Sequence, residues 1–430
     1  MKNASFFLVL IAISLLSCGD SDDTPQDPKG LWRGRIMVDR ESQGKELPFL
    51  FEVREKRDSL IAYFINGTER FSTNSIRYTG DSIFIRMDPY DSEIQAKITG
   101  SQMLGVWMNY SRGNNYHLPF HARAGENQRF YFDQKPVAKI SGRFKVQFGE
   151  VENAEDAIAE FVQNGNLVIG TFLTETGDYR YLEGSLDGDH LQLSCFDGAH
   201  AFLFEATVHN ENKIVSGRFY SGSHYETSWK ASRNEKFKLR KPTSITGMQP
   251  GAYQVYFTLQ DLENRILTPD HFSLCNKVIL VQIMGTWCPN CRDQTNYLKQ
   301  VYEKFGTDSL EIIAVGFEPE PSVAAAKLRL VDYREHFGIK YRLAYGGKSA
   351  KKSVHLVFPG LEAVKAYPTL IYIDKKGNVQ RIHAGFSGPA TSEYTNFVSE
   401  SDSLIQALIH FNYDSIPSDT SITPRVNPLM

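Results

Sequence analysis

Residues 278–294 have the sequence VILVQIMGTWCPNCRDQ, and this stretch decides the fold of the C-terminal part of the chain. Its first seven residues are nearly all apolar, which is typical of a central strand covered on both faces. Cys288 and Cys291 follow, with two residues between them. The proline after the first cysteine costs little at the first position of a helix, because its missing N–H would be unpaired there anyway. The stretch therefore predicts a buried strand, a tight turn and a helix over residues 289–305, ended by a glycine.

Strands and amphipathic helices alternate around this stretch. Residues 310–317, LEIIAVGF, predict the next strand, and residues 323–337 predict a helix. Residues 369–385 predict a hairpin, and a last helix is predicted around 395–409. The predicted order is β-α-β-α-β-β-α, which is typical of an α/β unit with a central sheet.

The two cysteines have three possible roles: a redox pair, half of a zinc site, or buried filler. At the start of a helix, backbone N–H groups and the positive end of the helix dipole stabilise a thiolate, which indicates Cys288 as a nucleophile. Cys291, one turn further in, would then resolve the mixed disulfide. Zinc needs four ligands, and the region around His271 and Cys275 offers no second ligand pair. We therefore favour the redox pair, and we expect no metal and no cofactor.

The same residues resemble a known active site. The run from Trp287 to Cys291 at a strand-to-helix junction, with Tyr367-Pro368-Thr369 opening a later strand, resembles a thioredoxin fold. Within that superfamily, residues 250–411 resemble the TlpA/ResA-like thiol-disulfide oxidoreductases, in a bacterial lipoprotein form. The resemblance implies that residues 343–364 are an extra element that this family inserts. The site residues are then catalytic Cys288 and Cys291, supported by Trp287, Pro289, Asn290, Tyr367 and Pro368.

The resemblance also implies roles for the supporting residues. Trp287 is expected to pack over the cysteines. Pro368 is expected to follow a cis peptide bond and to lie against the two thiols. The backbone beside Tyr367 would then pair with a bound substrate strand.

Two glutamines stand where related proteins carry carboxylates. Gln282 occupies the place of a buried aspartate of thioredoxins, and Gln294 occupies the place where this family often carries a glutamate. Either carboxylate would help to take the proton from the resolving thiol, and a neutral glutamine does not. Asp293 is near in sequence but is expected on a solvent-facing side of the helix. The proton acceptor of Cys291 therefore stays open at this point.

The N-terminus has the pattern of a secretory signal over residues 1–17. Its apolar run of eleven residues, 6–16, is shorter than the roughly 20 residues needed to cross a bilayer. LLSCG at 15–19 resembles a bacterial lipobox, which implies lipid attachment at Cys18. The acidic stretch 18–29 is predicted to be a tether. We expect a lipoprotein of the outer or cytoplasmic membrane that faces the periplasm, or one at the cell surface; the alternative is plain secretion.

The segment between tether and α/β unit is predicted to be all β. Short alternating runs rich in aromatic and β-branched residues are separated by turn dipeptides, which predicts antiparallel strands. The segment also repeats itself, which predicts two units, 30–130 and 131–235, each a small barrel or sandwich of about eight strands. Such a barrel either holds a small ligand or is filled by its own side chains. The matching stretches are 80–91 with 188–197, 105–116 with 217–225, and 120–123 with 229–233.

Composition and the remaining segments complete the domain plan. A linker is predicted over 236–250, a thioredoxin-like domain over 251–411 and a polar tail over 412–430. Hydrophobic residues make up 41% of the chain and the formal net charge is −3, which gives no basic field for nucleic acid. Cys195 and Cys275 are expected to be small apolar residues.

The sequence therefore predicts a membrane-anchored extracytoplasmic thiol-disulfide oxidoreductase. It would reduce disulfides of protein substrates, with electrons from an upstream membrane thiol reductant. The alternative is a ligand- or protein-binding lipoprotein, in which the β repeats carry the function and the thioredoxin-like domain is accessory.

Overall fold

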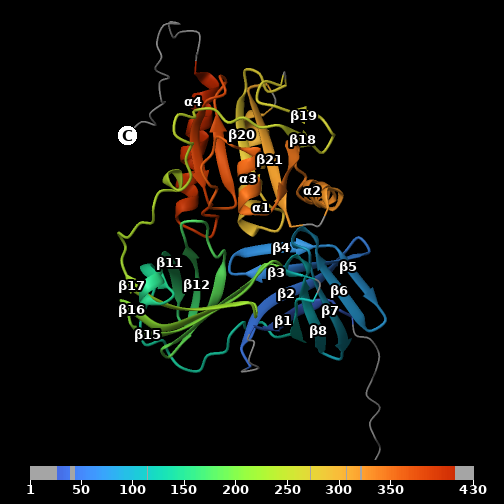
Figure 1. Ribbon diagram of the computed structural model, residues 1–430. Coiled ribbons are helices and arrows are strands. Elements are labelled where there is room, and N and C mark those ends of the chain that lie inside the picture. Colours follow the sequence, from blue (N-terminus) through green and yellow to red (C-terminus); the bar gives the residue numbers. More distant parts are fainter. Residues whose placement is uncertain are drawn as a thin grey trace, which may run out of the picture.

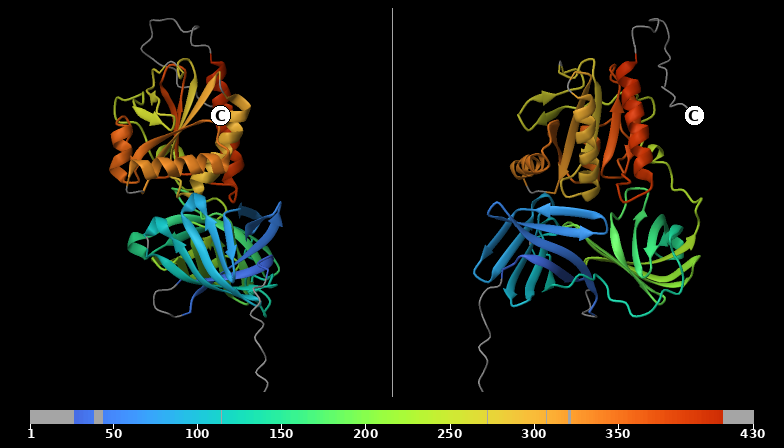
Figure 2. Two further views of the ribbon diagram at one scale, coloured as in Figure 1. Left: turned by 90° about the vertical axis from the view of Figure 1, so that its right-hand side faces the viewer. Right: turned by 180° about the vertical axis from the view of Figure 1, so that it is seen from behind.

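The computed structural model describes residues 27–38, 44–113, 115–271, 273–306, 308–319 and 322–411. The predicted signal sequence, Cys18 and the predicted tail 412–430 lie outside these residues. Two β units lie side by side, and an α/β unit lies across them (Figures 1 and 2). Within the described parts of the chain, no helix is both long and apolar enough to cross a membrane.

The first β unit is an antiparallel nine-stranded sheet of order β4-β3-β2-β1-β9-β8-β7-β6-β5. Side chains alternate between inside and outside along its strands, as in β1, because successive residues of a strand point to opposite faces. Its elements are β1 (Gly30–Met37), β2 (Glu46–Lys56), β3 (Ser59–Asn66), β4 (Glu69–Thr73), β5 (Ile76–Thr79), β6 (Ser82–Met87), the 3-10 helix η1 (Asp88–Tyr90), β7 (Ser92–Thr99), β8 (Gln102–Asn109), the 3-10 helix η2 (Tyr110–Arg112) and β9 (His117–Ala124).

The second β unit is a closed barrel in which each strand pairs with the next. Aromatic side chains fill its interior; the rings of Phe172 and Phe204, for example, stack with centroids 4.4 Å apart. This packing supports the filled alternative over a ligand-holding barrel. Its elements are β10 (Gly142–Phe148), the 3-10 helix η3 (Val151–Asn153), β11 (Glu155–Asn164), β12 (Leu167–Leu173), β13 (Leu182–Asp187), β14 (His190–Phe196), β15 (Ala201–Asn210), β16 (Lys213–Ser221) and β17 (Tyr225–Arg233).

The repeat seen in the sequence corresponds to equivalent strands of the two units. The three pairs of matching stretches fall on β6 and β14, on β8 and β16, and on β9 and β17. The prediction of an all-β half made of two repeated antiparallel units is confirmed.

The hydrophobic core of the first β unit extends onto one side of the second. Phe196, at the end of β14, inserts into the first unit, and its ring lies 4.4 Å from that of Phe49. Asn66 Nδ2 donates to the carbonyl oxygen of Phe196 at 2.9 Å, and Asn109 Nδ2 donates to that of Ala199 at 2.9 Å. These buried contacts hold the two units together as one body.

The α/β unit has a seven-stranded sheet of order β19-β18-β22-β21-β20-β23-β24. The helix predicted after the cysteines and the helix predicted at 323–337 have the bounds expected from the sequence. The predicted insertion contributes a strand and a helix, β22 and α3. The elements are η4 (Pro242–Ser244), β18 (Leu259–Asp261), β19 (Ile266–Leu267), β20 (Val278–Met284), α1 (Pro289–Phe305), β21 (Leu310–Glu318), α2 (Val323–Phe337), β22 (Arg342–Lys348), α3 (Lys351–Val357), β23 (Thr369–Ile373), β24 (Val379–Ala384) and α4 (Glu393–His410).

The central strand β20 is buried along its whole length, as its apolar sequence predicts. It pairs in parallel with β21 and antiparallel with β23. Helices α1, α2 and α4 share a core with one face of the sheet, and α3 shares a core with the other face. Because β20 leads directly into α1, the fold places the cysteine pair at the end of the sheet that faces the β units (Figure 1).

Candidate active site

Cys288 and Cys291 lie at the start of α1. Cys288 is the N-cap residue, and its Sγ accepts a hydrogen bond from the backbone N–H of Cys291 at 3.4 Å. Cys288 is 8% exposed and Cys291 is fully buried. Burial, together with the hydrogen bond to Cys288, raises the pKa of the Cys291 thiol well above its usual range. The pair therefore consists of one thiol with a small exposed fraction and one fully buried thiol that holds its proton tightly.

Aromatic residues border one side of the dithiol. The Tyr367–Pro368 peptide bond is cis, and Cys288 Sγ lies 3.6 Å from the carbonyl oxygen of Tyr367. The rings of Trp287 and Tyr367 meet edge to face, with centroids 5.4 Å apart. Trp287 Nε1 also donates to the carbonyl oxygen of Phe317 at 3.0 Å, which fixes the indole.

Asn290 contacts the second β unit. Its side-chain amide donates to the carbonyl oxygen of Asp178 at 3.2 Å. The carboxylate of Asp178 accepts a hydrogen bond from the backbone N–H of Gly388, and burial raises the pKa of Asp178 to about 6. The structure thus brings the predicted site residues, 287–291 and 367–368, together. It also places residues of the second β unit beside them.

Glu318 is a buried acid that the sequence analysis missed. It ends β21, is fully buried, and accepts hydrogen bonds from Thr286, from the backbone N–H at 2.9 Å and from Oγ1 at 2.8 Å. Its negative charge also contributes to the raised pKa of Cys291. In the sequence it is one of two glutamates of the run 310–318, and nothing around it distinguishes it from Glu311.

The two glutamines are both fully buried. Gln282 Nε2 donates to the carbonyl oxygen of Cys291 at 3.3 Å, so Gln282 supports the first turn of α1. Gln294 has no hydrogen-bond partner for its side-chain amide among the described residues. Neither side chain accepts a proton, so Glu318 is the better candidate for that role.

The expectation for Asp293 is wrong. Asp293 is only 7% exposed, because it pairs with Arg180 of the second β unit. Arg180 also pairs with Glu69 of the first β unit, lies 3.5 Å from Asp197, and donates to the carbonyl oxygen of Pro289 at 3.3 Å. One buried guanidinium therefore connects the first turn of α1 with both β units.

Replacing Arg180 by methionine should destabilise this three-way junction. The carboxylates of Asp293 and Glu69 would lose a buried partner, which typically costs about 3–5 kcal/mol. The midpoint of denaturant unfolding, followed by tryptophan fluorescence, measures the change. Arg240→Met is the control, since Arg240 pairs with Glu175 at the surface and should leave the midpoint almost unchanged. Equal midpoints for both variants would contradict the structural role of Arg180.

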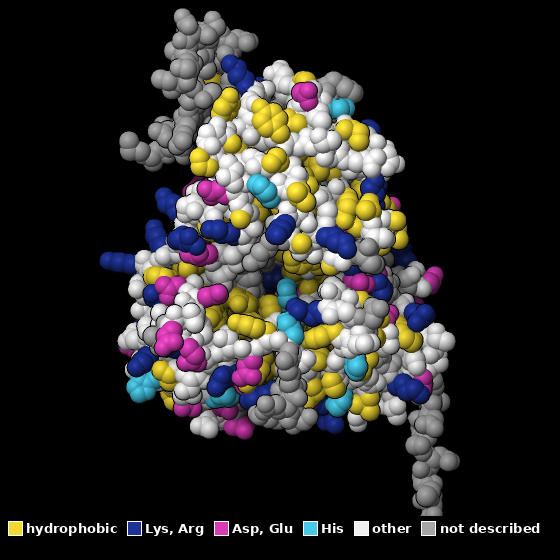
Figure 3. Space-filling view, viewed as in Figure 1, with side chains coloured by type: hydrophobic (Ala, Val, Ile, Leu, Met, Phe, Trp, Pro, Cys, Tyr) yellow, Lys and Arg dark blue, Asp and Glu magenta, His cyan; other side chains and the backbone are white. Residues whose placement is uncertain are grey.

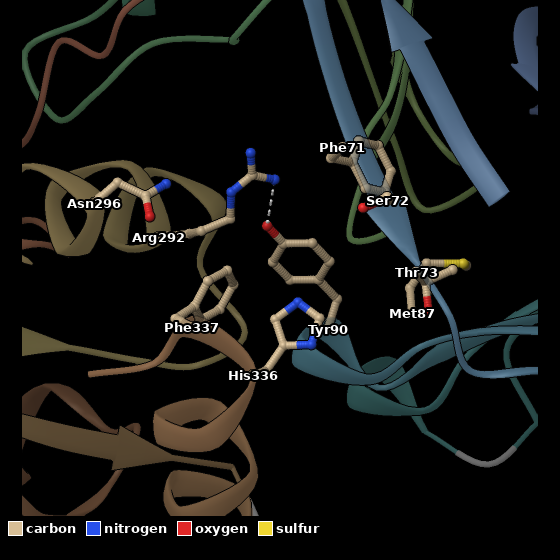
Figure 4. Close-up of a pocket in the computed structure, with 9 residues that line it drawn as sticks. All are labelled: Phe71, Ser72, Thr73, Met87, Tyr90, Arg292, Asn296, His336 and Phe337. Atoms are coloured by element: carbon tan, nitrogen blue, oxygen red, sulfur yellow. Dashed lines mark hydrogen bonds between the residues drawn. The ribbon is translucent and has the colours of Figure 1, made fainter. Parts of the chain in front are cut away.

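A pocket of about 190 Å³ lies between the first β unit and helices α1 and α2 (Figure 4). Arg292 reaches into it and donates to the hydroxyl of Tyr90 at 3.2 Å. Arg292 also pairs with Glu69 at 2.9 Å, so its charge is already compensated. The lining residues are Phe71, Ser72, Thr73, Met87, Tyr90, Arg292, Asn296, His336 and Phe337, and neither cysteine of the pair is among them.

The other described cysteines differ in their surroundings. Cys195 is fully buried, as expected of a small apolar residue. Cys275 is exposed, so the expectation that it is a small apolar packing residue is wrong; its thiol donates to backbone carbonyl oxygens of its own turn. In the described ranges, no three His, Cys, Asp or Glu residues form a group that could hold a metal ion.

Comparison with known proteins agrees with this geometry. Residues 257–398 match the Redoxin family model. The C-terminal unit is a Redoxin domain. The thiol-disulfide oxidoreductase ResA of Geobacillus thermodenitrificans is 27% identical over 143 residues, which are 33% of this chain and 74% of that protein. ResA of Halalkalibacterium halodurans is 28% identical over 141 residues, which are 31% of this chain and 68% of that protein.

Solved structures also resemble the Redoxin domain. The crystal structure of a thiol-disulfide isomerase from Corynebacterium glutamicum covers 38% of this chain and 100% of its own, with a TM-score of 0.30 and 18% identity. The resemblance to ResA-like proteins that the sequence predicted is thus confirmed by the family match and the ResA relatives. The thioredoxin fold itself is seen in the sheet order and in the position of the cysteine pair.

Proposed function

We propose that this chain reduces disulfides of protein substrates through Cys288 and Cys291, as a membrane-anchored enzyme outside the cytoplasm. The observation that supports this function is the arrangement of the two thiols in the Redoxin domain. Cys288 caps the helix and keeps 8% of its surface exposed, and Cys291 is fully buried one turn further in. A partly exposed nucleophile backed by a buried resolving thiol is the arrangement that thiol-disulfide exchange requires.

The reaction begins with the thiolate of Cys288. It attacks one sulfur of the substrate disulfide, so that a mixed disulfide forms and the second substrate sulfur leaves as a thiolate. Cys291 then loses its proton and attacks Sγ of Cys288. The Cys288–Cys291 disulfide forms, and the substrate leaves with both sulfurs reduced. Two electrons have passed to the substrate, and a membrane thiol reductant must return them to the enzyme.

We assign Glu318 as the acceptor of the Cys291 proton. Cys291 holds its proton tightly, so resolution needs a base close to the thiol. Glu318 is buried and fixed by Thr286, and its charge acts on Cys291. The proton that it receives can pass to the departing substrate thiolate, which completes the proton balance of the second step.

An insulin assay tests the activity. The full chain, kept reduced by dithiothreitol, should accelerate the reduction of insulin disulfides above the rate with dithiothreitol alone. The rate should saturate with insulin and depend linearly on the concentration of the chain. No acceleration of insulin or of a small disulfide reagent would refute the proposed activity.

The proposed membrane anchor depends on Cys18, which lies outside the described residues. In a bacterial host, Cys18→Ala should prevent lipid incorporation and release the chain from the membrane fraction, because one or more acyl chains supply the membrane affinity. Labelling with a palmitate analogue and fractionation measure both effects. Cys275→Ala, which also removes a cysteine, is the control and should remain labelled and membrane-bound. Release of both variants, or of neither, would contradict the anchor.

The alternative, a binding lipoprotein with an accessory Redoxin domain, has less support. The interior of the second β barrel is filled by its own aromatic side chains. The buried contacts of the β half instead converge on the first turn of α1, next to the dithiol.

A further inference from the structure

A turn of the second β unit lies directly against the active site. It consists of residues 174–178, TETGD, between β12 and β13, and we name it the capping loop. On one side of it, Asp178 accepts hydrogen bonds from the side chain of Asn290 and from the backbone of Gly388. These two partners belong to the start of α1 and to the loop that follows β24. The capping loop therefore covers both segments beside the cysteine pair.

The packing between the capping loop and the Redoxin domain is tight. A Cβ atom added to Gly385 would lie 2.9 Å from the carbonyl carbon of Thr176, and one added to Gly388 would lie 3.1 Å from Oδ2 of Asp178. A Cβ atom added to Gly177 would overlap the side-chain amide of Asn290. Even one added carbon atom at these glycines would force the neighbouring atoms to move. The gap between the capping loop and the Redoxin domain is therefore too small for a substrate segment.

The capping loop is also held in place from behind. Within it, the backbone N–H of Thr174 donates to the carbonyl oxygen of Gly177 at 2.7 Å. Arg240 of the linker donates from Nε to the carboxylate of Glu175 at 2.7 Å. Arg180, two residues after the loop, is fixed by the buried pairs with Asp293 and Glu69. These contacts fix the position of the capping loop beside the active site.

Access to Cys288 is narrow, because only 8% of the residue is exposed and the Tyr367 carbonyl oxygen lies 3.6 Å from its Sγ. Figure 3 shows that the molecular surface is hollowed between the Redoxin domain and the β units. A folded partner needs about 800 Å² of matching surface on each side of an interface, whereas neighbouring extended strands occupy only about 5 Å each. A narrow approach therefore admits an extended segment more easily than the surface of a folded domain.

We propose that the capping loop is a specificity determinant, which limits the substrates of this enzyme to disulfides carried by flexible, extended polypeptide segments. This inference rests on the proposed disulfide reduction and adds a substrate class to it. The loop acts by steric exclusion: it occupies the side of the dithiol on which a bulky partner would otherwise rest.

A shortened loop tests the inference. Leu173 and Asp178 are paired across the turn, so residues 174–177 can be replaced by Asn-Gly, which suits a two-residue hairpin. The control replaces Glu211 and Asn212 by Asn-Gly in the turn between the paired residues Asn210 and Lys213, which joins β15 and β16.

Two substrates separate the effects of size. One is a linear peptide closed by a single disulfide, and the other is a folded protein with a surface disulfide. In the shortened-loop variant, kcat/KM for the folded protein should rise about tenfold or more, which corresponds to a steric penalty of at least about 1.4 kcal/mol in the parent. For the peptide, kcat/KM should stay within about twofold of the parent value. The control variant should behave as the parent. Equal changes for both substrates, or no change, would overturn the inference.

Alkylation of Cys288 gives a readout that does not need catalysis. A maleimide attached to a polyethylene glycol chain should react about tenfold faster with the shortened-loop variant, while iodoacetamide should react at the parent rate. Circular dichroism shows whether the variant is folded. If the parent reduces neither substrate, the proposed activity fails; if the parent is active but the loop changes neither selectivity nor alkylation, only the inference about the loop fails.

Discussion

Replacing Cys288 by serine should abolish disulfide reduction, with a fall of more than about a thousandfold in kcat/KM for insulin. A serine hydroxyl stays protonated at neutral pH and does not attack sulfur, and the second thiol is fully buried, so Cys291 cannot take over the attack. The rate of insulin reduction with dithiothreitol as electron donor measures the loss.

Two further cysteine variants make this test specific. Cys275→Ser removes an exposed thiol away from the site and should leave the rate near that of the parent. Cys291→Ser keeps the attacking thiol but removes the resolving one, so a mixed disulfide between Cys288 and the substrate should accumulate and be visible by mass spectrometry. Activity of Cys288→Ser close to that of the parent would exclude the proposed mechanism.

The parts of the structure that the sequence predicted depend on local patterns. The apolar run of β20 and the proline that opens α1 lie within a few residues of one another, and each has its own conformational preference. The repeated units were predicted for a similar reason, since alternation and turn dipeptides are local signals. Such patterns are sufficient to predict elements and their order.

The parts that were missed depend on contacts between distant segments. Asp293 is buried because Arg180, more than a hundred residues earlier, lies against it, and no pattern around either residue indicates the partner. The sequence suggested a binding role for the β half as an alternative, whereas the structure brings this half to the first turn of α1. Glu318 was missed for the same reason: the residue ends a strand, and only the parallel pairing of β20 with β21 brings it to Thr286, just ahead of the cysteine pair.

Replacing Glu318 by glutamine should slow the second half of the reaction and spare the first. A general base typically contributes a factor of about 10²–10⁴, so we expect resolution of the mixed disulfide to slow by at least about a hundredfold. Formation of the mixed disulfide should keep its rate, because it depends on the thiolate of Cys288. Rapid mixing with a chromophoric disulfide separates the two steps, since each releases its own thiolate. The control is Glu311→Gln, which removes another buried carboxylate of β21, one that pairs with Arg342 at 3.2 Å.

The dependence on pH distinguishes a proton acceptor from a merely structural carboxylate. The negative charge of Glu318 raises the pKa of Cys291, so removal of the charge should lower that pKa. Without the base, resolution must wait for the fraction of Cys291 that is ionised, and this fraction grows as the pH rises. The defect of Glu318→Gln should therefore be largest near neutral pH and shrink toward alkaline pH, whereas a variant that only loosens the fold should be equally slow at every pH. A defect independent of pH, or equal slowing of both steps, would remove Glu318 from the mechanism and leave the buried thiol without an assigned base.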